Sequence, residues 1–110
     1  MRGDLTVTSL NDPHARKLQR LVERILEGPG TLDVNVRRAI ADDVGVAGAL
    51  APYVEKVARR PYQISDSDIE ELRRAGYSED QIFEATISAA LAAGLRRLEA
   101  GLGALRTESA

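Results

Sequence analysis

The chain has 110 residues, of which 44% are hydrophobic, 29% are charged and 4% are aromatic, and its net charge is −2. This length suits one domain, and aliphatic residues with alanine must form its core, which favours packed helices over a β-sandwich. The chain contains no cysteine, so disulfides, thiolate nucleophiles and thiolate zinc sites are excluded. The slightly negative charge argues against a protein whose main task is binding nucleic acid.

The hydropathy pattern indicates neither a secretory leader nor a membrane span. The N-terminal residues contain no apolar segment typical of a signal peptide. The longest charge-free run, residues 85–95, is too short and too rich in alanine to cross a bilayer. We therefore expect a cytoplasmic protein with no membrane partner and no nucleic-acid partner, and the lack of cysteine fits that compartment.

Residues 1–11 are polar and show no periodicity, which predicts a flexible N-terminal arm. Asp12 and Pro13 then form a helix-start signal, with an N-cap followed by proline at the first helical position. Apolar residues follow at helical spacing until residues 28–30, Gly-Pro-Gly, where this helix is expected to end. The whole helical domain is expected to span residues 12–106.

Two shorter helices are expected next. Asp33 or Asn35 can cap the first of them, which carries Ile40 on its apolar side. The second has Pro52 in its first turn and stops at Pro61, because proline disfavours helical backbone in the residue before it.

The sequence then repeats one local signal, I-S-D-S-D-I at residues 64–69 and Y-S-E-D-Q-I at residues 77–82. In a capping box, a serine before a helix accepts a bond from the third helical residue, whose side chain bonds back. Ser65 and Asp68 can form one such box, and Ser78 and Gln81 the other. A short helix and a longer one are therefore predicted on either side of a glycine turn.

The last helix is predicted to run from Ser78 to about Leu105, with residues 107–110 fraying. Residues 85–95 are apolar on nearly all sides, which is typical of a helix buried on all sides. We expect a compact all-α domain of about five helices that ends in this long, largely buried helix. Burial within one chain and burial against a second subunit both stay open.

The large apolar residues of the last helix recur at spacings of three and four and form one predicted stripe: Phe83, Ile87, Leu91, Leu95, Leu98, Leu102 and Leu105. The residues expected in helix packing or in a subunit interface are Ile87, Ala89, Leu91, Ala93, Leu95, Leu98 and Leu102.

Three side chains are candidates for chemistry, although no complete catalytic set is evident. Burial would raise the pKa of Glu84 and suit a general acid or base, whereas exposure would leave it without a role. His14 is the only histidine; it lacks a nucleophile partner and is expected on the surface. Arg97 is a candidate for binding an anionic ligand. The sequence predicts neither a metal site nor a cofactor.

Four arginine pairs, at residues 37–38, 59–60, 73–74 and 96–97, could bind phosphate or carboxylate groups. The simpler interpretation is a set of ion pairs on helix surfaces. Glu55 lies four residues before Arg59, and Glu70 lies four residues before Arg74.

Residues 72–82 also have the spacing of a helix-turn-helix. A DNA-reading helix would begin at Ser78, and the next two residues, Glu79 and Asp80, would repel the phosphate backbone. A DNA-binding module is therefore the least favoured hypothesis.

The segment D-x-D-I-x-x-L-R-x-A-G-Y-S-x-x-x-I-F at residues 66–83, followed by L-R-R-L-x-x-G-L-G at residues 95–103, resembles the alkylhydroperoxidase-D-like and carboxymuconolactone-decarboxylase-like family. The resemblance is to the C-terminal half of the peroxidase-related members and covers residues 50–105. Residues 53–57 take the place of the family's Y-x-x-K-x segment. Arg97 takes the place of the arginine before Gly-Leu-Gly.

This resemblance implies an all-helical fold that buries helices between subunits, often in trimers or hexamers. The family's peroxidases use a C-x-x-C pair, a histidine three residues on and an upstream glutamate. Here the corresponding region offers only His14, so thiol-based peroxidase chemistry is excluded. The family's lactone decarboxylases do not depend on that thiol pair, so an acid–base enzyme stays open.

The resulting hypothesis is an oligomeric, non-catalytic member of this family with a structural, binding or regulatory role. It would form homo-oligomers or assemble with a cysteine-bearing paralogue. The alternative is a cofactor-free acid–base enzyme or a small-ligand-binding protein of the same fold, which would use Glu84 and Arg97.

Overall fold

The structure is a computed structural model that describes the backbone of residues 13–109 and the side chains of residues 16–106. The described chain forms five α-helices and one 3₁₀ turn, without a strand, which confirms the predicted all-α class. The flexible arm predicted at residues 1–11 and the Asp12 cap lie outside the described residues. The elements are α1 (Pro13–Glu27), α2 (Val34–Asp42), α3 (Leu50–Arg59), η1 (Pro61–Gln63), α4 (Asp66–Arg74) and α5 (Glu79–Ser109).

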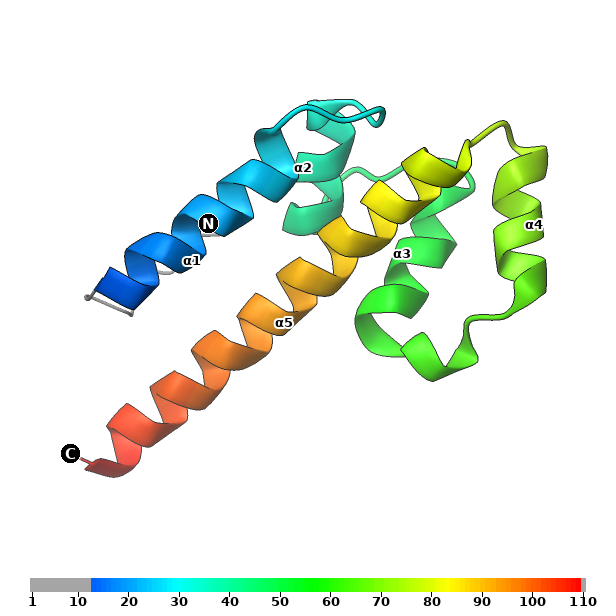
Figure 1. The fold of residues 1–110 in the computed structure, drawn as a ribbon. Helices are drawn as coiled ribbons and strands as arrows, with labels where there is room; N and C mark the ends of the chain where they lie inside the picture. Colours follow the sequence, from blue (N-terminus) through cyan, green and yellow to red (C-terminus); the bar gives the residue numbers. More distant parts are fainter. Residues whose placement is uncertain (1–12, 110) are drawn as a thin grey trace.

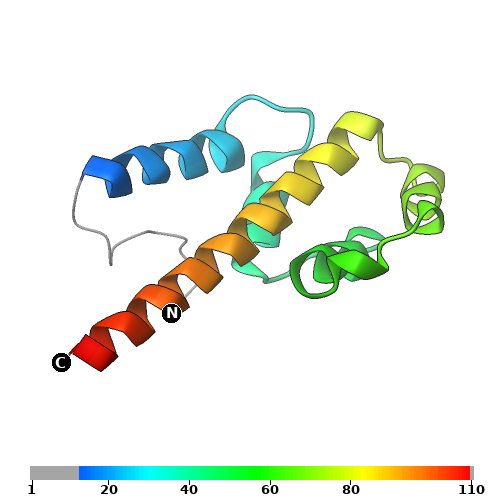
Figure 2. The ribbon, with the colours of Figure 1, turned by 60° about the horizontal axis from the view of Figure 1, so that its bottom comes forward.

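The long helix α5 crosses the whole molecule, with α1 and α2 on one side and α3 and α4 on the other (Figure 1). Most of its packing is against α2 and α3. The C-terminal turns of α5 extend beyond the other helices (Figure 2). The radius of gyration, 15.1 Å, therefore exceeds the value of about 13 Å expected for a compact domain of this size.

The core consists of two apolar clusters that follow each other along α5. The first joins the start of α5 to α2, α3 and α4 and includes Leu50, Leu72 and Ile82. The second joins the middle of α5 to α1 and includes Val22 and Leu26. The two clusters fix the helices on two sides of α5, and none of the other described helices covers its remaining side (Figure 1).

The side of α5 that faces the core is built mainly from small residues. Ala85, Ser88, Ala89 and Ala92 are buried there, together with Leu95. Short side chains let α2 and α3 approach the α5 backbone closely. The predicted stripe of large residues is thus not the inner face: Leu95 is buried, but Phe83, Leu98 and Leu105 are 64%, 41% and 63% exposed.

The predicted start of α5 is correct, but the predicted end lies too early in the chain. Ser78 and Gln81 form the expected capping box, with Ser78 N–H donating to Gln81 Oε1 at 2.9 Å and Gln81 N–H donating to Ser78 Oγ at 3.1 Å. The helix continues to Ser109, four residues beyond Leu105 and into the segment predicted to fray. No proline interrupts this end, so nothing in the local sequence stops the helix.

Candidate functional site

Glu84, near the start of α5, binds the loop between α1 and α2. Its Oε1 accepts the backbone N–H of Leu32 at 2.7 Å. Its Oε2 accepts the backbone N–H of Thr31 at 2.9 Å and the Thr31 hydroxyl at 3.1 Å. Gly30 leaves room for this contact, because a Cβ there would lie 2.8 Å from Oε1. The carboxylate is thus occupied by the protein's own backbone.

The pKa of Glu84 lies below its ordinary value, contrary to the raised pKa that burial alone would produce. Burial is the largest single influence and raises the pKa, but the bonds from Thr31 and Leu32 and the positive charge of Arg37 together outweigh it. Glu84 therefore stays ionised at neutral pH and is a poor general acid. The loop partly buries this side chain, which therefore lies between the buried and the exposed alternatives.

Arg37 holds the other side of the same loop. Arg37 is buried. Its guanidinium donates to three carbonyls: Leu32 O at 3.0 Å, Ile25 O at 2.9 Å and Gly28 O at 2.7 Å. Two of these carbonyls lie at the C-terminal end of α1, where a cation also complements the helix dipole. Arg37 and Glu84 together fix the α1–α2 connection onto α5.

Arg96 and Arg97 of α5 donate hydrogen bonds to two different helices. Arg96 Nη1 donates to Ala41 O at 2.9 Å at the end of α2, and Arg97 Nη2 donates to Ala58 O at 2.7 Å near the end of α3. Arg97 also lies about 20 Å along the α5 axis from Glu84. The structure therefore does not bring these two candidates into one site.

The remaining arginines of the predicted pairs form mainly surface contacts, but with partners other than those expected. Glu55 binds Arg60 rather than Arg59. Asp43 binds Arg59 at 3.1 Å. Similar surface pairs join Arg38 to Glu27 and Arg73 to Glu79. Such exposed pairs contribute little to stability.

His14 lies within α1, but its side chain is outside the described part of the structure. Among the side chains that the structure describes, no group of three or more histidine, aspartate or glutamate residues could hold a metal ion. None of the described helices is long and apolar enough to cross a membrane.

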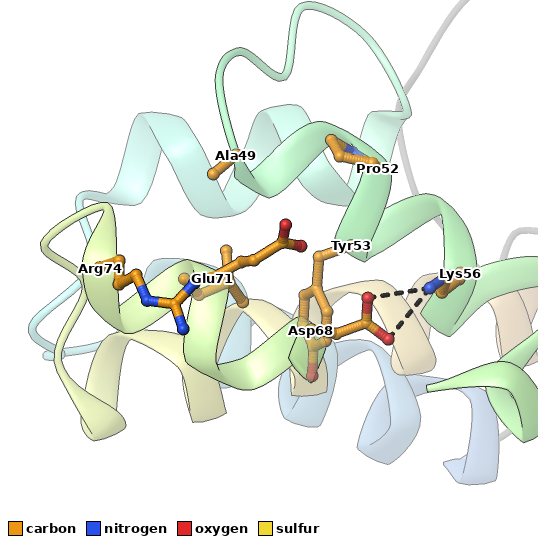
Figure 3. Close-up of a pocket in the computed structure, with 8 residues that line it drawn as sticks. Ala49, Pro52, Tyr53, Lys56, Asp68, Glu71 and Arg74 are labelled. Carbon is orange, nitrogen blue, oxygen red and sulfur yellow. Dashed lines mark hydrogen bonds and ion pairs between the residues drawn. The ribbon is translucent and has the colours of Figure 1, made fainter. Parts of the chain in front are cut away.

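A groove of about 400 Å³ opens between α3 and α4 (Figure 3). Lys56 and Asp68 close one end of it, with Lys56 Nζ 2.9 Å and 3.0 Å from the two Asp68 oxygens. The pKa of Asp68 is lowered by the Lys56 hydrogen bond first, and next by the Ser65 backbone bond. No sequence pattern predicts this groove, because its walls come from two separate helices.

Between Phe83 and Leu105, one side of α5 that points away from the core carries only apolar residues. We call this side the free face of α5, because none of the other described helices covers it. It contains Phe83, Ile87, Ala90, Gly94, Leu98, Gly101 and Leu105. These positions repeat every three or four residues, so they share one side of the helix. Ile87 is half-buried and the other six are exposed or open to solvent, and none is charged.

The structure divides the predicted packing residues between these two faces. Ala89, Ala93 and Leu95 are buried inside the chain. Ile87, Leu91 and Leu102 are half-buried, and Leu98 is exposed on the free face. The sequence signal that could have located the free face is its lack of any charged residue at seven helical positions.

These features define an all-helical protein whose longest helix is packed on one side and apolar on the other. The chain matches no protein-family model, no curated protein and no solved structure.

Proposed function

We propose that this chain is an oligomeric, non-catalytic member of the alkylhydroperoxidase-D-like and carboxymuconolactone-decarboxylase-like family, and that it associates with a second copy through the free face of α5. The observation that carries the proposal is this face itself. Soluble monomers rarely expose a long contiguous apolar surface. From Phe83 to Leu105 the face extends over about 33 Å of helix.

The middle of the free face suits close helix packing. Ala90 and Gly94 are exposed there, and nothing lies within 4 Å of a Cβ built on Gly94. Larger residues flank this point, Phe83 on one side and Leu98 and Leu105 on the other. Two α5 helices that cross at the small residues would bring these larger side chains into contact.

Charge favours an antiparallel pair. The start of α5 carries Glu79 and Asp80, whereas its second half is mainly basic among the described side chains, with Arg96, Arg97 and Arg106 beside one acidic residue, Glu99. An antiparallel arrangement places acidic residues of one copy beside basic residues of the other, and it also aligns opposite helix dipoles. A parallel arrangement would place like charges together.

A hollow beside Phe83 supports the same arrangement. It has a volume of about 450 Å³ and apolar walls that include Ile69, Ile82 and Phe83. Its charged lining residues are Glu79 and Asp80 together with Arg73, which is paired with Glu79. In an antiparallel pair, the leucines from the second half of the partner α5 would enter this hollow. The nearby arginines would meet its acidic residues.

The family assignment rests on residues 66–83 and 95–103 and on the all-helical fold. The non-catalytic role is supported by the occupation of Glu84 and Arg97 in helix and loop contacts. An acid–base enzyme built on these two residues is correspondingly less favoured. Small-ligand binding is the second candidate function, and the groove between α3 and α4 favours it.

The test is the solution mass of the full chain by sedimentation equilibrium. We expect twice the chain mass of 11.9 kDa, or an even multiple of it. Phe83→Glu and Leu98→Glu should both shift the mass to that of one chain, with unchanged helical circular dichroism. The matched control is Tyr62→Glu, because Tyr62 is 81% exposed but lies outside the free face. A wild-type protein with the mass of one chain would refute the association.

The cysteine-free sequence allows a direct test of orientation. A cysteine at Ala90 or Gly94 should form a disulfide between copies, because the proposed helix crossing brings the Cα atoms of these positions close together. A disulfide needs Cα atoms within about 7 Å. A cysteine at Leu105 should form none in an antiparallel pair. Efficient crosslinking at Leu105 would instead indicate a parallel pair and overturn the proposed orientation.

A further inference from the structure

The groove between α3 and α4 has the size of a small-molecule site. Its volume, about 400 Å³, falls within the range of about 300–1,000 Å³ found for ligand pockets. The helices α3 and α4 contribute facing walls (Figure 3). The lining residues are Ala49, Pro52, Tyr53, Lys56, Asp68, Glu71, Leu72 and Arg74.

The wall between the charged groups is apolar and firmly held. Tyr53 is buried, and its hydroxyl lies 2.6 Å from Thr86 Oγ1 on α5. Leu72 is also buried. Pro52 adds a rigid ring at the mouth of the groove. This surface can accept an aliphatic or aromatic group without rearrangement.

The four charges of the groove differ in whether they are already neutralised. Lys56 and Asp68 bind each other through two contacts of 2.9 Å and 3.0 Å. In the part of the chain that the structure describes, the side chains of Glu71 and Arg74 form no hydrogen bond or ion pair, although the backbone carbonyl of Glu71 accepts from Ala75 N–H. The charges available to a ligand are therefore one carboxylate and one guanidinium.

We propose that this groove binds a small zwitterion with an apolar side chain, of the α-amino acid class. Glu71 and Arg74 lie three residues apart on α4, so their Cβ atoms are about 5–6 Å apart on one side of the helix. Arg74 can bind the ligand carboxylate through its planar fork. Glu71 can bind the ammonium group, while the ligand side chain lies on Pro52 and Tyr53.

The charge pattern selects this class over simpler ligands. A plain carboxylate would be attracted by Arg74 but repelled by Glu71, and Lys56 is held by Asp68. A plain amine would be attracted by Glu71 but repelled by Arg74. Only a ligand with both charges on neighbouring atoms satisfies Glu71 and Arg74 together. No groove residue belongs to the free face of α5, so this proposal and the proposed function can fail separately.

The experiment is a titration of the full chain, labelled with nitrogen-15, with L-leucine up to about 10 mM, which detects dissociation constants into the millimolar range. We expect the backbone amides of residues 49–56 and 68–74 to shift with saturation. Two analogues separate the charges: 4-methylpentanoate lacks the amine, and 3-methylbutylamine lacks the carboxylate. Each should bind at least about tenfold more weakly than leucine.

Matched variants assign the two charges. Glu71→Gln and Arg74→Gln should each weaken leucine binding about tenfold. Glu70→Gln and Arg20→Gln are the controls, because both residues are exposed and neither lines the groove; leucine binding should be unchanged in both. No saturable shift in the groove with leucine, or equal binding of either analogue, would overturn the proposal. So would unchanged binding in Glu71→Gln and Arg74→Gln.

Discussion

The backbone N–H of Leu32 donates a 2.7 Å hydrogen bond to Oε1 of Glu84, which joins a loop to a helix 52 residues later in the sequence. The same carboxylate binds Thr31 through two further donors. A side chain that resembled a catalytic acid in the sequence therefore anchors the α1–α2 loop.

Glu84→Gln should lower the free energy of unfolding by about 1–2 kcal/mol. This loss is near the low end of the range for hydrogen bonds to a charged group, because Thr31 is exposed and solvent screens its contact with the carboxylate. A glutamine can accept from only one of the two backbone donors, and its amide would face the other. Urea unfolding at one protein concentration measures the change. Glu70→Gln, a surface substitution on α4, should stay within about 0.5 kcal/mol of wild type. An equal loss in both variants would contradict the anchoring role.

The contribution of Glu84 should depend on pH in a defined direction. Its folded pKa is lowered relative to 4.5, so the folded state holds the proton less tightly than the unfolded state does. The stabilisation is therefore fully present above the unfolded pKa and is lost as the pH falls through the folded pKa. The stability difference between wild type and Glu84→Gln should be largest near neutral pH and should shrink below about pH 4.5. A difference that grows on acidification would contradict this assignment.

Gly30→Ala should also weaken the anchor. The added Cβ would lie 2.8 Å from Oε1 of Glu84 and 3.1 Å from Oε2, so the carboxylate must move away from its donors. We expect a loss of about 1–3 kcal/mol in the free energy of unfolding. Gly103→Ala is the control, because nothing lies within 4 Å of its Cβ, it lies outside the free face, and alanine favours helix by up to about 1 kcal/mol. In the double variant Gly30→Ala, Glu84→Gln the two losses should be less than additive.

Arg37→Met should be the most damaging of these substitutions. It removes a buried guanidinium and leaves the carbonyls of Ile25, Gly28 and Leu32 without their donor. We expect a loss of about 3 kcal/mol or more. The neighbouring Arg38→Met changes a surface ion pair with Glu27 and should cost less than about 1 kcal/mol. Similar melting temperatures for the two variants would show that Arg37 does not support the fold as described.

Features set by neighbouring residues were predictable from the sequence. The capping box of Ser78 and Gln81 involves atoms three residues apart, and the turn glycine before it, Gly76, has a φ of 103°. Both depend on local backbone chemistry alone. The start of α5 was therefore predicted correctly. The end of α5 was not predicted correctly, because the helix continues to Ser109 through residues that contain no stop signal.

Features set by distant contacts were not predictable. The sequence could not show that Glu84 meets Thr31 and Leu32, because no local pattern specifies a loop 52 or 53 residues away. The groove between α3 and α4 was missed for the same reason. The partners of the arginines were also partly misassigned, since helix spacing alone favoured Arg59 over Arg60 for Glu55.

The sequence by itself determined the all-helical class, the starts of α4 and α5 and the exclusion of thiol chemistry, because these depend on residue type and on contacts within one or two turns. Only the tertiary structure decided which side of α5 is buried. In an isolated sequence the alanine side and the leucine side both satisfy helical periodicity. Packing resolved this ambiguity: α2 and α3 approach closely over Ala85, Ala89 and Ala92, and Phe83, Leu98 and Leu105 are left on the opposite face.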